Sequence, residues 1–358
     1  MPTAPHRSES MLAALRLVAP GRPLREGLDR ILQAKMGALI VVGDGPDVLS
    51  LCSGGFLLDA EFTPQRLSEL AKMDGAMILS SDCTRIARAN VHLVPDPDIP
   101  TSETGTRHRT AERVAKQIDA PVIAISEERS LVAVHRKGVK RTLEPVARVL
   151  SRADQALQIL ERYKARLDAV SNSLSALEVE DLVTVRDVAT ALQRAEMVRR
   201  IAEEIEGYVI ELGADGRLIL LQLEELMGGV DDDRRLFAKD YFVPGPDYGL
   251  HDALDALAGL DTESILDLRD VAEVLRLPHD AGLDTAVQPR GFRLLHKIPR
   301  VPESVAEHVV DRFDHLQKIM RAGVPELVEV EGVGEARARA IKEGLARLAE
   351  SSILDRYV

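Results

Sequence analysis

Cysteine and aromatic residues are scarce in this chain. Its 358 residues include two cysteines, Cys52 and Cys83, no tryptophan, and only 3% aromatic residues in all. Two cysteines without a CxxC pair exclude a disulfide framework and a cysteine-rich zinc site, and they favour a reducing compartment. So few aromatic side chains also argue against an RNA-binding surface built on base stacking.

Long apolar runs are missing as well. No segment approaches the roughly 18 apolar residues that a membrane-spanning helix needs. Arg16 interrupts the apolar stretch Met11–Leu15, which is therefore too short for a secretory signal. We expect no membrane contact and a cytoplasmic protein.

What the chain does have is apolar and charged material for folded domains. Hydrophobic residues make up 45% and charged residues 29%, which excludes a disordered chain. At about 100–200 residues per domain, the length suggests two or three domains. The net charge is −12, and residues 151–287 hold 29 acidic against 14 basic side chains. This acidic charge argues against nucleic-acid binding along the whole chain, but it does not exclude a local basic patch at either end.

Residues 1–150 have the pattern of an α/β domain with a mixed sheet flanked by helices. Apolar runs and alternation predict several strands, three of them in a row at the end, where no long crossover separates them. Such neighbours indicate antiparallel pairing in a mixed sheet. The predicted helices are 8–18, 24–34, 64–73 and 110–118, and the predicted strands are 38–42, 76–79, 85–94, 121–126, 131–135 and 140–143.

The rest of the chain is predicted to be helical. Residues 151–286 carry apolar side chains at helical spacing over 153–170 and again over 177–205, which indicates an all-α spacer. Residues 287–358 contain two similar layouts, 293–313 and 324–345, each with a tight turn between two helices. We interpret them as a tandem helix-hairpin-helix, with the second turn at Gly332-Val333-Gly334.

Two motifs in the first domain carry possible chemistry. Asp74-Gly75-Ala76 lies between a predicted helix and strand, where a carboxylate can hold a cation or accept a proton; it can also be an ordinary turn. Residues 105–112 (GTRHRTAE) lie at a loop-to-helix junction, where amides, arginines and threonines suit a polyphosphate. An exposed basic cluster is the alternative. No P-loop or Rossmann fingerprint is present.

Taken together, these two motifs resemble the diadenylate cyclase domain. The resemblance continues through the Leu160–Lys164 stretch (LERYK) and the C-terminal tandem hairpin, and thereby extends to the family of DNA integrity scanning proteins, DisA. It implies an enzyme that joins two ATP molecules into cyclic di-AMP, releases two pyrophosphates and uses Mg²⁺ or Mn²⁺. It also implies a nucleoid-associated protein with a role in the response to DNA damage and in DNA repair.

The resemblance implies a role for each matching residue. Asp74 is the expected catalytic carboxylate and metal ligand, while Arg107 and Arg109 are expected to stabilise the leaving pyrophosphate. The expected ATP-binding residues are Gly75, Ala76, Leu93, Thr106, Arg107, His108, Arg109 and Thr110. Positioning and charge stabilisation are what phosphoryl transfer needs, which agrees with these residue types.

Stoichiometry adds a geometric requirement. One site that holds one ATP cannot make a cyclic dimer, because each 3′-hydroxyl must attack the α-phosphorus of the other nucleotide. Two cyclase domains must therefore face each other across a two-fold axis. The resemblance points to a homo-octamer.

The second hairpin is the expected contact to double-stranded DNA, and the resemblance implies that branched DNA is bound as well. Turn amides bind DNA phosphates without reading sequence. The residues assigned to this contact are Gly332, Val333, Gly334, Arg337, Arg339 and Lys342. In the first hairpin, prolines replace the glycines, so we expect it to be mainly structural. A protein–protein hairpin without DNA contact is the alternative.

Three functions remain open at this point. The first is a diadenylate cyclase regulated by DNA. The second is a DNA-binding protein whose first domain only senses ATP. Such a sensor should still bind ATP after loss of the Asp74 carboxylate. The third is an oligomeric scaffold, which tolerates loss of Arg107 and Arg109 as well.

Overall fold

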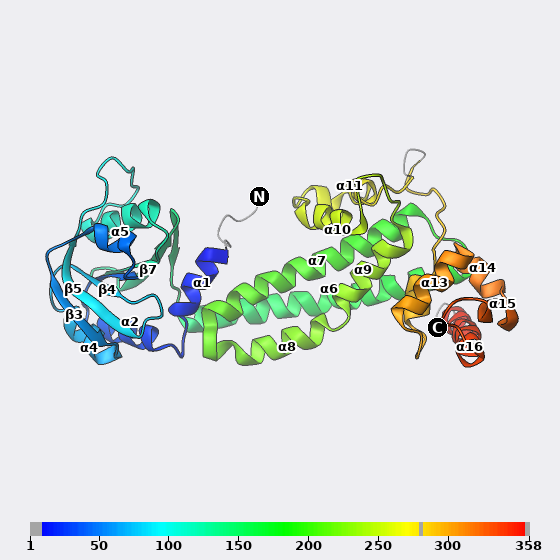
Figure 1. Cartoon of the computed structure of the whole chain (residues 1–358), viewed down its shortest axis with the longest axis horizontal. Helices are drawn as coiled ribbons and strands as arrows, with labels where there is room; N and C mark the ends of the chain where they lie inside the picture. The colour runs from blue at the N-terminus through cyan, green and yellow to red at the C-terminus, as the bar shows by residue number, and fades with distance from the viewer. Residues whose placement is uncertain (1–8, 279–281, 355–358) are drawn as a thin grey trace. The chain divides into compact units, whose positions relative to one another are not determined.

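The computed structural model describes residues 9–278 and 282–354 (Figure 1). Contacts between residues divide the chain into two compact units. The first contains residues up to Gln155 together with Glu204–Gln222. The second contains Ala156–Glu203 together with the residues from Leu223 onward, so that most of the predicted spacer and both hairpins share one unit.

The first unit is built on the mixed sheet that the sequence predicts. Its strand order is β2-β5-β4-β1-β6-β7-β8, and β3 also pairs with β5. Strands β1 and β4 are parallel, and the other pairs in the described part of the sheet are antiparallel. The strands are β1 (Ala38–Val42), β2 (Cys52–Ser53), β3 (Phe56–Glu61), β4 (Ala76–Leu79), β5 (Arg85–Leu93), β6 (Val122–Ser126), β7 (Leu131–Arg136) and β8 (Val139–Thr142).

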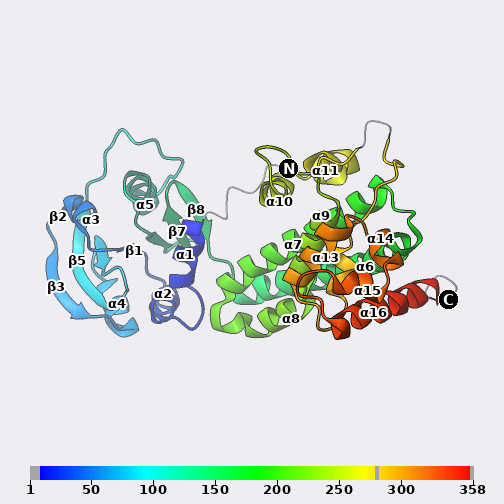
Figure 2. The same ribbon diagram turned by 45° about the vertical axis from the view of Figure 1, so that its right-hand side comes forward.

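Helices cover both faces of this sheet (Figure 2). Helices α1 (Glu9–Leu17), α2 (Pro23–Gln33) and α4 (Pro64–Leu70) bury aliphatic side chains against one face. Helices α3 (Pro46–Ser50) and α5 (Thr106–Gln117) cover the other. Alternate residues of the strands feed the two cores, which explains why β1 and β4 are continuous apolar runs.

Strands β2 and β3 escape the sequence prediction for a physical reason. The first is only two residues long, and β3 has mostly exposed side chains, with Leu57 75% exposed. A strand that buries neither face shows no alternation for a pattern to detect.

In the helical region, α6 (Val146–Glu180) and α7 (Val185–Leu212) are long helices. The predicted helical spacing over 177–205 crosses the break between them, since α6 ends at Glu180 and α7 begins at Val185. Asp181 there has φ +59°, and the Thr184 amide and hydroxyl both donate to the Asp187 carboxylate, at 2.9 and 2.6 Å. This cap starts a new helix. Further helices are α8 (Arg217–Met227), α9 (Val230–Tyr241), α10 (Leu250–Gly259) and α11 (Leu268–Val274).

The tandem hairpin is confirmed. In the first repeat a turn at 297–302 separates α12 (Phe292–His296) from α13 (Glu303–Phe313). In the second, a turn at 329–334 separates α15 (Val324–Val328) from α16 (Glu335–Leu354), and α14 (Leu316–Arg321) joins the repeats. One aliphatic core contains residues of both repeats, so they form a single folding unit.

Candidate active site and nucleic-acid interface

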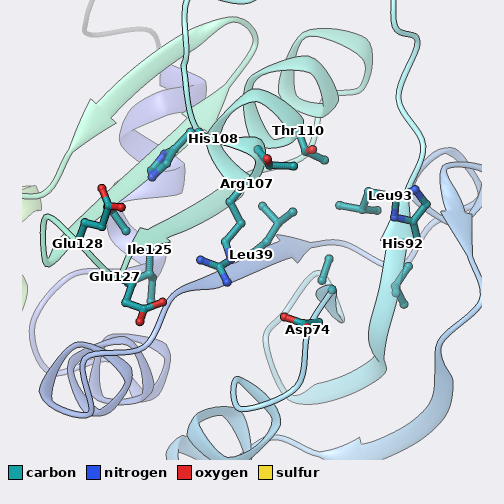
Figure 3. Close-up of a pocket in the computed structure, with 16 residues that line it drawn as sticks. Leu39, Asp74, His92, Leu93, Arg107, His108, Thr110, Ile125, Glu127 and Glu128 are labelled. Atoms are coloured by element: carbon teal, nitrogen blue, oxygen red, sulfur yellow. The ribbon is translucent and has the colours of Figure 1, made fainter.

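A cavity of about 540 Å³ opens at one edge of the sheet in the first unit (Figure 3). Strands β1 and β4 begin there and their antiparallel neighbours β5 and β6 end there, since Leu39 pairs with Ala76, and Ala76 with Val91. Its size suits a nucleotide. The lining residues are Leu39, Asp74, Gly75, Ala76, Val91, His92, Leu93, Gly105, Thr106, Arg107, His108, Thr110, Ile125, Ser126, Glu127 and Glu128.

Asp74 and Gly75 lie in the turn that leads from α4 into β4. The Asn90 side-chain amide donates a 2.7 Å hydrogen bond to the Asp74 carbonyl. Gly75 has φ +89°, and a Cβ there would lie 2.9 Å from backbone atoms of Asn90 and Val91. Only glycine fits this turn so close to β5. The exposed Asp74 carboxylate has no ion pair with any other described residue and is free for a ligand.

Helix α5 begins at Thr106, four residues before the predicted start at residue 110. The prediction missed this turn because it is polar and lacks apolar periodicity. Its N-cap is Gly105, which has no side chain to cap the helix, and the Arg109 amide already bonds to the Gly105 carbonyl at 2.9 Å. The earlier amides are therefore open to an anion at the positive end of the helix.

The two arginines of this turn have different surroundings. Arg107 is half-buried and reaches into the cavity beside Leu39, with Asp74 on one side of its guanidinium and Glu127 on the other in the view of Figure 3. Its guanidinium has no hydrogen bond or ion pair to another residue in the described ranges. Arg109 is exposed and does not line the cavity, as expected for residues two positions apart on a helix. Its role at the site stays a prediction.

Several cavity residues were not predicted from the sequence. Glu127 and Glu128 follow β6 and place acidic side chains on the wall (Figure 3). Leu39 and Ile125 contribute apolar surface from β1 and β6. The available signal was the acidic pair Glu127 and Glu128 directly after a buried strand. Because this pair is far from both motifs in the sequence, its place in the same cavity could not be predicted.

His108 lies beside a second, buried histidine. The ring centroids of His108 and His135 are 6.4 Å apart, and His135 is 1% exposed. Burial lowers the pKa of His135 to about 4, and it also lowers the pKa of His108. Both rings are therefore neutral at pH 7, so Arg107 supplies the positive charge inside the cavity.

The proline-rich loop at residues 95–104 is bound along α5. The Glu112 carboxylate accepts hydrogen bonds from the Thr101 hydroxyl, at 2.6 Å, and from the Ser102 amide, at 3.0 Å. Although burial opposes it, hydrogen bonds from Lys116, Thr101 and Ser102 lower the pKa of Glu112 to about 2. The loop is thus fastened to the helix that carries the motif.

The second hairpin presents its turn to solvent. Gly332 has φ +80° and is exposed, Val333 is packed in the core, and a Cβ on Gly334 would meet no atom within 4 Å. Arg337 is exposed and donates to the Gly332 carbonyl at 2.7 Å, so a cation stands directly at the turn. The other two predicted cations are engaged, Arg339 with Glu335 and Lys342 with the Met320 carbonyl.

The first hairpin is tied to the helices of its own unit instead. Arg293 of α12 is 2% exposed and forms a 2.5 Å ion pair with Glu178 of α6, which is 1% exposed. Asp240 of α9 accepts three backbone hydrogen bonds of 2.7–2.8 Å from the start of α12. The Lys297 ammonium donates to the Ser175 hydroxyl of α6 at 3.0 Å. These contacts support the structural role expected for this hairpin.

Among the described residues, no group of three or more histidine, cysteine, aspartate or glutamate side chains is arranged to hold a metal. None of the helices in these ranges is both long enough and apolar enough to cross a bilayer.

Fold and site define a class of protein: a nucleotide-binding α/β domain, a helical spacer and a tandem helix-hairpin-helix. Family models match in the same order. Residues 25–140 match the DisA bacterial checkpoint controller nucleotide-binding family, 143–283 its linker region, and 293–353 the helix-hairpin-helix motif.

Curated relatives agree over nearly the full length. The DNA integrity scanning protein DisA of Frankia alni is 57% identical over 348 residues, which cover 97% of each chain. That of Streptomyces coelicolor is 55% identical, covering 97% of this chain and 94% of its own. A crystal structure of a DacA double mutant from Staphylococcus aureus matches with a TM-score of 0.28 and 25% identity, over 38% of this chain and 89% of that one. The chain belongs to the DisA family.

Proposed function

We propose that the 540 Å³ cavity performs the cyclase reaction of this family on ATP held at the start of α5. The protein is a diadenylate cyclase: it joins two ATP molecules into cyclic di-AMP and releases two pyrophosphates. The observation that carries the assignment is the free Asp74 carboxylate in one cavity with the free Arg107 guanidinium, beside an uncapped helix N-terminus.

The lining separates into an apolar and a polar part. Leu39, Val91 and Leu93 offer aliphatic surface for an adenine ring. The Thr106 and Thr110 side chains and the first amides of α5 offer donors for the triphosphate. Arg107 adds a fixed positive charge with planar donor geometry, which suits a phosphate.

A divalent cation fits this site. Mg²⁺ is commonly held by one or two carboxylates together with substrate phosphates and water, so the Asp74 oxygens suffice on the protein side. Mn²⁺ accepts the same oxygen donors. Bound there, the ion neutralises charge on the triphosphate.

The reaction is a substitution at phosphorus. Asp74 orients the ribose 3′-hydroxyl and accepts its proton. The 3′-oxygen then forms a bond to the α-phosphorus of the other nucleotide, and the bond between that phosphorus and the oxygen bridging to the β-phosphorus breaks. Arg107 stabilises the negative charge that builds on the departing pyrophosphate.

The cyclic product requires two facing cavities, one from each of two subunits. Strand β3 supports such a contact surface. It pairs with β5, which lines the cavity, and its Phe56 and Leu57 are 56% and 75% exposed. Exposed apolar neighbours of this kind mark interaction surfaces. The exposed Arg109 then becomes available to a triphosphate at the shared interface. We propose a homo-oligomer of such pairs, with eight subunits as the resemblance implies.

The C-terminal domain is a DNA-binding helix-hairpin-helix domain. We propose that its second hairpin contacts phosphates of double-stranded or branched DNA through the Gly332–Gly334 turn and Arg337. We further propose that DNA regulates the cyclase, which places the protein in the cytoplasm at the nucleoid, in the response to DNA damage.

The test is product analysis. Purified protein incubated with ATP and Mg²⁺ or Mn²⁺ is expected to yield cyclic di-AMP, identified by chromatography and mass. In oligomers mixed from wild-type and Asp74→Asn subunits, mixed pairs form one bond but not the second, so a linear dinucleotide should accumulate. Absence of any product with either metal, from protein that binds ATP, would demote the domain to a nucleotide sensor.

A further inference from the structure

Gly37 is a buried glycine that neither motif includes. It lies between the end of α2 and the start of β1, two residues before Leu39 of the cavity wall. Its backbone does not require glycine, since it is absent from the positive-φ residues of the described chain. The reason for a glycine must therefore be the space that a side chain would fill.

That space is occupied by Arg107. A Cβ on Gly37 would overlap Arg107 Nη1, and it would lie 2.7 Å from Cζ and 3.2 Å from Nη2. The guanidinium therefore lies directly against the Gly37 backbone, although the two residues are far apart in the sequence. No other atom within 4 Å comes closer to this position than these three.

The manner in which Arg107 is held matters for its chemistry. A carboxylate partner would fix a guanidinium, but it would also neutralise the charge and occupy the donors that a phosphate needs. Among the described residues, Arg107 has no such partner. Packing against a bare backbone holds the guanidinium without a carboxylate, so no acidic partner takes the N–H donors that a phosphate needs.

We propose that Gly37 is a positioning residue that holds the Arg107 guanidinium in place for the triphosphate. Any larger residue at this position displaces the guanidinium from β1 into the cavity. The proposal rests on the proposed ATP site and identifies how its central cation is kept both ordered and unpaired.

The test is a double-mutant cycle in the full-length protein. Gly37→Ala should weaken ATP binding and reduce kcat/KM by roughly tenfold or more, because alanine fits the backbone but moves the guanidinium. In the Arg107→Ala background the same change should have less than about a twofold effect. The matched control is Gly45→Ala, where φ is −71° and a Cβ meets no atom within 4 Å; it should behave as wild type.

Two readouts keep the outcomes distinct. ATP affinity, measured by calorimetry, reports on Gly37 even if no cyclic di-AMP forms. Absence of cyclic di-AMP would overturn the proposed function but not the positioning role of Gly37. Wild-type affinity and turnover in Gly37→Ala would overturn the positioning role. So would a loss that is equal with and without Arg107, since it would show that Gly37 acts on the fold and not through the arginine.

Discussion

Two groups of charged residues in this molecule have opposite surroundings. Around the cavity, Asp74 and Arg107 have no charged partner among the described residues. Between α6 and α12, Glu178 and Arg293 are 1% and 2% exposed and paired at 2.5 Å, and the Tyr241 hydroxyl donates to the same carboxylate oxygen at 2.7 Å. The first group is free to bind, whereas the second is engaged in holding the fold.

The contrast shows how charge can be interpreted in one chain. Removing one partner of a buried ion pair leaves the other charge buried without compensation, so the substitution lowers the free energy of unfolding. A free charge in an open cavity adds little to stability, and its removal appears in ligand affinity and rate. Substitutions in the buried pair should therefore change stability, and substitutions in the cavity should change activity.

The largest expected effect on stability comes from the buried pair. Glu178→Gln leaves the Arg293 charge buried without its counter-charge and should lower the free energy of unfolding by about 3–5 kcal/mol. Urea unfolding of the full chain, followed by circular dichroism, measures it. Glu161→Gln, at an exposed position of the same helix, is the control and should change stability by less than about 0.5 kcal/mol. A loss of less than about 1 kcal/mol for Glu178→Gln would contradict the conclusion that this pair holds the fold.

Arg107→Ala should show the reverse pattern. We expect kcat/KM to fall by about 100-fold, equivalent to about 2.7 kcal/mol, because the charge facing the leaving pyrophosphate is lost. The free energy of unfolding should stay within about 0.5 kcal/mol of wild type. Steady-state kinetics and unfolding are measured on the same preparation. Strong destabilisation with near-normal turnover would contradict the assignment.

The two hairpins allow a smaller comparison. Arg337→Glu removes an exposed cation at the second turn and should weaken DNA binding about tenfold, with a shallower salt dependence. Lys297→Gln, in the first hairpin, removes a cation whose ammonium is bonded to Ser175 and should leave the salt dependence unchanged. Fluorescence anisotropy over a salt series distinguishes them. Equal slopes for both variants would mean that the wrong surface has been assigned to DNA.

The last effect depends on pH and concerns a buried but neutral group. Burial lowers the pKa of His135 to about 4 in the folded chain, below its ordinary value, so the unfolded chain binds the extra proton first. The contribution of His135 to stability is therefore intact above about pH 6.5 and decreases towards pH 4, by up to about 2–3 kcal/mol. His135→Gln should flatten this part of the stability profile. An identical profile in the variant would exclude His135 as its source.

The local sequence pattern was sufficient to predict the strands and helices that bury an apolar face. The predicted bounds of β1 and β4 agree with the structure to the residue, and both hairpin turns were located. Of the predicted ATP-binding residues, only Arg109 falls outside the cavity lining. That the others bind ATP stays a prediction.

The remainder depended on contacts that no local pattern encodes. Gly37 and Arg107 meet only because α5 packs on the sheet beside β1, and Glu127 joins the cavity because β6 ends beside the start of β1. Exposed β3 left no alternation to detect. The polar first turn of α5 likewise lacked the apolar spacing that marks a helix.

The most direct measurement combines ATP binding with product analysis for wild type and Asp74→Asn. The account predicts that Asp74→Asn still binds ATP, while its rate of cyclic di-AMP formation falls by at least about 100-fold. Asp47→Asn, at an exposed carboxylate of α3, is the matched control and should keep wild-type turnover. Wild-type turnover in Asp74→Asn would contradict the central claim that this carboxylate carries the reaction.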